Sequence, residues 1–105
     1  MEEIVLVLTA VPEDFDADAL ARALVEERYA ACVSVLPAQV STYRWKDAIE
    51  TAKERQLIIK TTASRVGGLW KAIRERHPYE VPEILELRPT GGDPSYLDWV
   101  RKSVT

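Results

Sequence analysis

The fold is decided at an eight-residue stretch that a helix enters and a strand leaves: His77-Pro78-Tyr79-Glu80-Val81-Pro82-Glu83-Ile84. Pro78 lacks a backbone N–H and disfavours the helical conformation at the residue before it, so a preceding helix must end at His77. Pro82 keeps Val81 extended and leads into an apolar strand. A junction this stiff holds its side chains in fixed directions. That suits a binding site, and it equally suits a structural corner.

Working outward from this junction, hydrophobic periodicity predicts four strands and three helices in one domain, residues 1–105. The strands are expected at 4–9, at 31–36 with a continuation at 40–45 after Pro37, at 49–62 and at 83–88. The helices are expected to begin at the caps Asp16, Ser64 and Asp93, with apolar stripes such as Ala17, Leu20, Ala21, Leu24 and Val25. The order is β-α-β-β-α-β plus a C-terminal helix, which predicts an α+β, ferredoxin-like fold with an antiparallel sheet.

Two features of this pattern predict a homo-oligomer. The first strand is apolar on both faces, and two helices cover only one face of a sheet. We therefore expect the last helix or other subunits to cover the second face. The strands at 40–45 and 49–62 form a long hairpin with a turn at Lys46 and Asp47, and its tip must project beyond so small a domain. We expect the aromatic side chains Tyr43 and Trp45 near this tip to pack against another subunit.

Composition excludes several classes of function. A net charge of −3 argues against a nucleic-acid or anionic-membrane partner, and the first apolar run is too short to span a membrane. The strand at 57–61 lacks the aromatic residues on which RNA-binding domains of the same element order stack bases. No glycine-rich phosphate loop follows a strand. Cys32 is the only cysteine, so an internal disulfide is impossible and a reducing cytoplasm is expected.

Three side chains are candidate metal ligands, of which His77 comes first, followed by Glu80 and Cys32. The stiff backbone of the junction would fix the directions of the His77 and Glu80 side chains. Each candidate also has a structural interpretation. His77 suits the negative end of a helix, Cys32 suits a small buried position in a strand, and carboxylates such as Glu80 and Glu83 suit a solvated turn. A high-affinity site normally needs about four ligands, so copies from neighbouring chains would have to contribute.

The sequence resembles the CutA divalent-cation tolerance family over nearly its whole length. The matching motifs are Ala30-Ala31-Cys32-Val33, Tyr43-Arg44-Trp45-Lys46 with Ile49-Glu50, Ile59-Lys60-Thr61, the junction His77 to Ile84, and Tyr96-Leu97-Asp98-Trp99. The resemblance implies a tight homotrimer with an architecture like that of the PII signalling proteins. It also implies a cytoplasmic protein linked to tolerance of copper and other divalent cations. Some members carry a cysteine near the end of the first strand and a second histidine before the Pro-Tyr motif, where this chain has Leu8 and Arg76.

The function expected from these observations is a trimeric metal-response protein that binds copper or another divalent cation weakly and is not an enzyme. The alternative is a PII-like sensor or scaffold that binds a small molecule or a partner protein in clefts between subunits. A third hypothesis is a hydrolase that uses His77 and a carboxylate.

Overall fold

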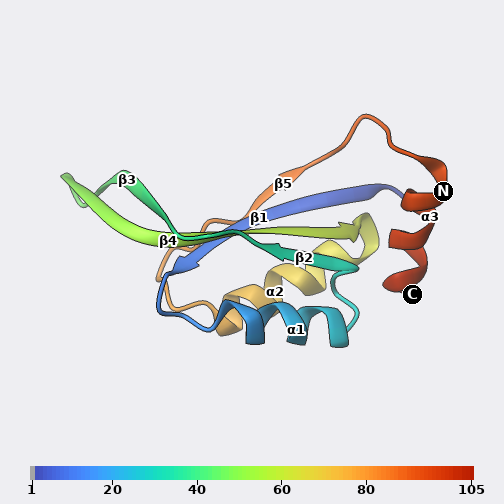
Figure 1. Ribbon diagram of the computed structural model, residues 1–105, viewed down its shortest axis with the longest axis horizontal. Helices are drawn as coiled ribbons and strands as arrows, with labels where there is room; N and C mark the ends of the chain where they lie inside the picture. Colours follow the sequence, from blue (N-terminus) through green and yellow to red (C-terminus); the bar gives the residue numbers. More distant parts are fainter. Residues whose placement is uncertain (1) are drawn as a thin grey trace.

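The computed structural model describes residues 2–105 and shows an α+β protein with an antiparallel sheet and two helices on one of its faces (Figure 1). The elements follow one another as β1 (Ile4–Pro12), α1 (Ala17–Glu26), β2 (Cys32–Val35), β3 (Gln39–Trp45), β4 (Ala48–Thr62), the 3-10 turn η1 (Ala63–Arg65), α2 (Val66–Arg76), β5 (Leu85–Leu87) and α3 (Pro94–Ser103). This succession confirms the predicted order of strands and helices. Within residues 2–105, no helix has the length and apolar character needed to cross a membrane.

Strand β4 organises the sheet. Its 15 residues pair with β3 over the first half and with β2 over the second half, and it also pairs with β1. The sheet order is β2-β4-β1-β5, and every pairing is antiparallel. In the register between β1 and β4, Ile4 lies opposite Thr62 and Pro12 lies opposite Glu54. Glu54 therefore sits where β4 leaves the body of the sheet and continues into the hairpin.

The β3–β4 hairpin projects well beyond the helices, and it accounts for the longest dimension of the molecule, 45 Å (Figure 1). Its turn lies at Lys46 and Asp47, with φ of 49° and 66°. Two successive residues with positive φ form the kind of two-residue turn whose twist matches that of the flanking strands. The predicted projecting hairpin and its predicted turn are both confirmed.

The core lies between the sheet and the pair α1 and α2. Alternate residues of β1 and β4 point into it, and its fully buried side chains include Val5, Val7, Leu57 and Ile59 from the sheet and Leu24, Leu69 and Ile73 from the helices. Asp16 caps α1 as predicted, because its Oδ1 accepts a hydrogen bond from the Ala19 N–H at 3.0 Å. The side chain of Asp93 caps α3 in the same way through the Tyr96 N–H, and Pro94 occupies the first turn.

On the opposite face of the sheet, helix α3 covers one end. There α3 packs Val100 and Val104 against Ile4 and Ala31. Farther along, the register places Leu87 beside Leu6 and Leu85 beside Leu8. Leu85 and Leu87 are 55% and 46% exposed in the single chain. The last helix thus covers part of this face, and an apolar strip along β1 and β5 stays open.

Several local predictions are wrong, among them the end of the first strand, which runs to Pro12 and not only to residue 9. Ser64 does not cap α2; it lies within the preceding 3-10 turn, and its backbone N–H donates to the Glu2 carboxylate at 3.1 Å. Val25 does not belong to the buried stripe of α1, because the helix ends at Glu26 and leaves this side chain 41% exposed. The last strand is shorter than predicted, Leu85–Leu87, since the segment after Pro82 pairs with β1 only there.

Candidate functional site

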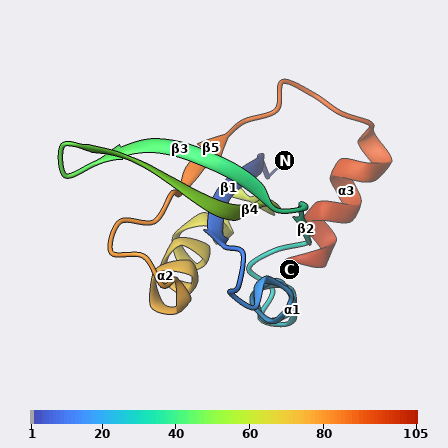
Figure 2. The ribbon, with the colours of Figure 1, turned by 60° about the vertical axis from the view of Figure 1, so that its left-hand side comes forward.

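The candidate site is the corner that follows α2. The helix ends at Arg76, and His77 has the extended values φ −79° and ψ 135°, as the following Pro78 requires. From this corner the chain runs past the base of the β3–β4 hairpin and on to β5 (Figure 2). The predicted end of the helix at His77 is confirmed.

The imidazole of His77 ties the corner to β1. Its Nε2 lies 2.7 Å from the Ala10 carbonyl oxygen, and its Nδ1 accepts a hydrogen bond from the Tyr79 N–H at 3.1 Å. An Nδ1 that accepts leaves the proton on Nε2, which donates it to Ala10, so this arrangement fits the neutral ring. Burial lowers the pKa of His77 below its ordinary value of 6.5, against the opposing effects of the Ala10 hydrogen bond and the Glu54 carboxylate. Both ring nitrogens are therefore used in holding the backbone.

Two further side-chain hydrogen bonds tie the corner to β4. The Tyr79 hydroxyl donates to Glu54 Oε2 at 2.7 Å, and the Gln56 amide donates to Glu83 Oε2 at 2.7 Å. Burial, and then the hydrogen bond to Glu54, raise the pKa of Tyr79 well above its usual range. Tyr79 thus stays a phenol that donates, and Glu54 accepts from it while being only 8% exposed.

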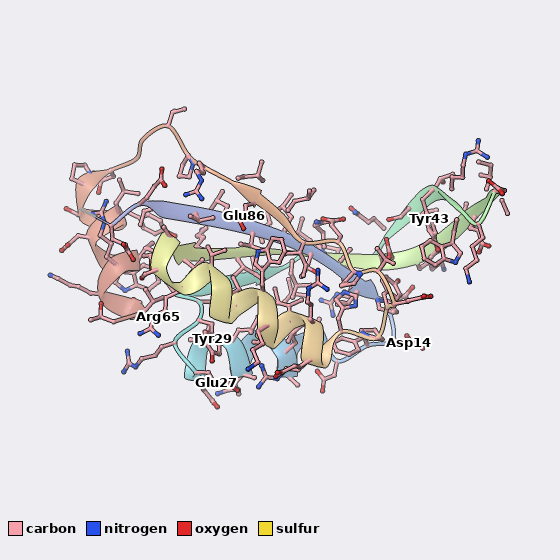
Figure 3. All side chains as sticks on the ribbon, turned by 180° about the vertical axis from the view of Figure 1, so that it is seen from behind. Asp14, Glu27, Tyr29, Tyr43, Arg65 and Glu86 are labelled. Atoms are coloured by element: carbon pink, nitrogen blue, oxygen red, sulfur yellow. The ribbon has the colours of Figure 1, made fainter. Side chains whose placement is uncertain are left out.

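A cavity of about 500 Å³ opens between the corner and the hairpin. Its wall combines three aromatic rings with three carboxylates: Tyr43, Trp45 and Tyr79, and Glu54, Glu80 and Glu83. Tyr43 stands on the hairpin, away from the helices (Figure 3). The structure therefore places both aromatic residues of the predicted hairpin tip against a cavity of their own chain. Their predicted contact with another subunit stays a prediction.

The three predicted ligands do not meet within one chain. Glu80 is exposed on the cavity wall, beside the His77 corner. Cys32 is half-buried on β2, opposite Lys60, which in turn lies opposite Leu6 on β1. His77 is bonded to Ala10, four residues farther along β1, which places the two sites about 13 Å apart along the strand. Among residues 2–105, no group of three or more His, Cys, Asp or Glu side chains is placed to hold one metal ion.

Sequence reasoning missed Glu54 and Gln56 as partners of the corner. Both lie in the middle of a long strand, more than twenty residues before Tyr79 and Glu83, and their side chains look like ordinary polar positions in a hairpin. Only the register of β4 brings them under the corner. One signal was available: Glu54 comes three residues before the buried run that starts at Leu57, where an exposed strand enters the core.

Known proteins that match this chain agree on one family. The family model described as CutA1 divalent ion tolerance protein matches residues 5–103. The chain belongs to the CutA1 family. The divalent-cation tolerance protein CutA of Thermus thermophilus is 43% identical over 98% of both chains, and that of Pectobacterium atrosepticum is 39% identical over 97% of this chain and 93% of its own.

Solved CutA structures have the same fold. The divalent cation tolerance protein of Thermus thermophilus superposes with a TM-score of 0.91 at 42% identity, and each chain is covered completely. CutA of Xylella fastidiosa superposes with a TM-score of 0.93 at 40% identity, over 98% of this chain and 99% of its own. The resemblance to this family is thereby confirmed, and so is an α+β fold with an antiparallel sheet.

Proposed function

We propose that this CutA1 chain serves tolerance of divalent cations by binding copper or another divalent cation weakly. The observation that carries the proposal is the wall of the corner cavity, where Glu54, Glu80 and Glu83 bring three carboxylates to one hollow of the surface. Carboxylate oxygens bind hard divalent cations, whereas copper prefers imidazole or thiolate. Weak binding is expected because one chain supplies no complete ligand set within residues 2–105.

The three ligands predicted from the sequence are Glu80, His77 and Cys32. They differ in the contacts that each would have to give up or gain in order to bind a metal ion. Glu80 makes no hydrogen bond or ion pair with any residue of 2–105, so its carboxylate is available. His77 would have to release Ala10 or Tyr79 before a ring nitrogen could bind copper. Cys32 is half-buried at a separate place on the sheet, and it would need ligands from another copy of the chain. We therefore rank Glu80 first, ahead of His77, which is the first candidate from the sequence alone.

We further propose a ferredoxin-like protomer in a PII-like homotrimer, formed through the open apolar strip and the projecting hairpin. The support is the exposure of Leu85 and Leu87 beside Leu6 and Leu8, a patch that a monomer would leave in water. Light scattering behind a sizing column tests this. A mass of three chains is the expected result, and the mass of one chain at micromolar concentration would exclude the trimer.

A binding protein fits the geometry better than a hydrolase. Both nitrogens of His77 are engaged with backbone groups, so the ring has none free to take a proton from water.

The free thiol of Cys32 supports the proposal of a cytoplasmic protein. The size of the cavity and its aromatic wall favour the second candidate, a PII-like sensor of a small molecule.

Calorimetric titration of Cu(II) and Zn(II) into the metal-free protein tests the cation proposal. Glu80→Gln, His77→Ala and Cys32→Ser remove the proposed ligands one at a time, and Glu75→Gln, on the exposed side of α2, is the matched control. The expected result is saturable binding that Glu80→Gln weakens and Glu75→Gln leaves unchanged. Metal heats that no ligand variant alters, or no binding at all, would overturn the proposal and mark the corner as structural.

A further inference from the structure

The carboxylate of Glu54 is buried without a cation. The residue is 8% exposed, its Oε2 accepts the Tyr79 hydroxyl, and it forms no ion pair with any residue of 2–105. Buried carboxylates are rare in proteins unless a positive group or a metal pairs with them. The Tyr79 hydroxyl contributes one neutral donor, which satisfies one oxygen and leaves the charge without a counterpart. Because Glu54 lines the cavity, a ligand in the cavity is in a position to supply the missing cation.

The walls beside Glu54 favour an organic cation. The rings of Tyr43, Trp45 and Tyr79 line the same cavity. Aromatic faces attract ammonium groups, and they also cover the carbon chain attached to them. The Trp45 ring already has an ammonium over it, since Lys46 Nζ lies 5.6 Å from its centroid. The cavity therefore offers one occupant both the carboxylate of Glu54 and an apolar, aromatic wall.

The cavity has room for an occupant larger than a bare ion, and a single chain would hold such an ion only weakly. A volume of about 500 Å³ lies within the range of small-molecule sites, roughly 300–1,000 Å³. A divalent ion needs several oxygens converging at about 2–2.6 Å, and residues 2–105 place no three acidic, cysteine or histidine side chains in that way. An ammonium needs only one carboxylate and an apolar neighbour for its carbon chain.

We propose that the corner cavity binds a small organic cation with a primary ammonium group, which pairs with Glu54 while its carbon chain packs against Trp45 and Tyr43. This inference goes beyond tolerance of divalent cations; it places a different ligand in the cavity that carries the cation proposal, and separate titrations of the two ligands distinguish them. The ligand class follows from the buried carboxylate of Glu54, which forms no ion pair among residues 2–105 and lines an aromatic cavity.

Titration of n-butylammonium into the assembled, metal-free protein tests the inference by calorimetry. Pentanoate has a chain of similar length with the opposite charge and is the control ligand. Glu54→Gln keeps an oxygen for the Tyr79 hydroxyl but removes the charge, and Glu75→Gln is the control variant. We expect saturable butylammonium binding, no pentanoate binding, a loss of about tenfold or more in Glu54→Gln, and no change in Glu75→Gln.

Trp45→Ala is a second test that leaves Glu54 in place. Trp45 is 37% exposed on the hairpin, so its removal should spare the fold and still weaken butylammonium binding about tenfold. The inference is overturned if butylammonium does not bind. A lysine of a second chain that already occupies the cavity would give this result. It is equally overturned if pentanoate binds as well, or if a folded Glu54→Gln or Trp45→Ala protein binds like the wild type. Cu(II) or Zn(II) binding retained on the same preparation would then leave the cation proposal standing.

Discussion

Two neighbouring glycines in α2 should respond to the same substitution with opposite signs. Gly67 and Gly68 are the second and third residues of the helix. A Cβ added at Gly67 would meet no atom within 4 Å, whereas a Cβ added at Gly68 would lie 2.5 Å from Tyr29 Cε1 and 3.0 Å from Tyr29 Cδ1. Gly67→Ala should therefore stabilise the protein, and Gly68→Ala should destabilise it.

The magnitudes follow from helix propensity and packing. Alanine is preferred over glycine in a helix by about 0.5–1 kcal/mol, which is the expected gain at Gly67. At Gly68 the ring of Tyr29 would have to retreat from 2.5 Å to beyond 3.4 Å, where ordinary contact begins. That ring packs on the core, and the backbone around it is fixed, because the Tyr29 carbonyl accepts the Thr61 hydroxyl at 2.7 Å. Overpacking of this kind costs about 1–3 kcal/mol, which exceeds the propensity gain and leaves a net loss at Gly68 of about 1 kcal/mol, and at most about 2.5 kcal/mol.

Guanidinium or thermal unfolding at one fixed protein concentration measures both effects, since an oligomer's stability depends on concentration. For a chain of this size, 1 kcal/mol moves the melting temperature by about 4–8 °C. The background Tyr29→Leu isolates the cause, because without the ring Gly68→Ala should become as favourable as Gly67→Ala. A Gly68→Ala protein at least as stable as Gly67→Ala in the wild-type background would refute the reasoning.

The other predictions concern single polar groups. The Thr9 hydroxyl is buried without a hydrogen-bond partner among residues 2–105, so Thr9→Val should leave the unfolding free energy unchanged or raise it by about 1 kcal/mol; a clear loss in denaturant melts would contradict this. Tyr79→Phe removes the hydroxyl that donates to the buried Glu54 and should lower the unfolding free energy by about 1–3 kcal/mol, whereas an unchanged midpoint would mean that the bond contributes nothing. Burial lowers the folded-state pKa of His77, so on acidification the unfolded chain binds a proton first. The contribution of the neutral His77 side chain to the free energy of unfolding should be complete above about pH 6.5 and be lost as the pH falls through the folded-state pKa. Unfolding in a chelator from pH 8 to 5 measures that slope, and His77→Gln should flatten it.

Much of the fold was predictable because local rules fix it. Pro78 ends α2 wherever that helix packs, and the alternation in β1 requires apolar cover on both sides. The start of α2 was not predictable. Ser64 has the residue type of a cap, but its N–H donates to the Glu2 carboxylate from the other end of the chain.

The candidate site, too, was predictable from the sequence only in part. The sequence pointed to the corner and to His77 and Glu80 there, because a rigid Pro-Tyr-Glu-Val-Pro segment stands out in any chain. It could not show that both nitrogens of His77 are engaged by Ala10 and Tyr79, since these contacts depend on which part of β1 the corner packs against. Nor could it show that Cys32 lies far from them along the sheet.

The sequence by itself determined which segments form helices and strands, except at the start of α2, and which family the chain resembles, because both depend on local residue patterns. Only the tertiary structure decided that Glu54 is buried under Tyr79 and that the aromatic hairpin encloses a cavity with it. The physical reason is the register between β1 and β4. One slipped position would turn Glu54 to the opposite face of the sheet, and the pairing joins residues of two strands that lie more than forty positions apart in the chain.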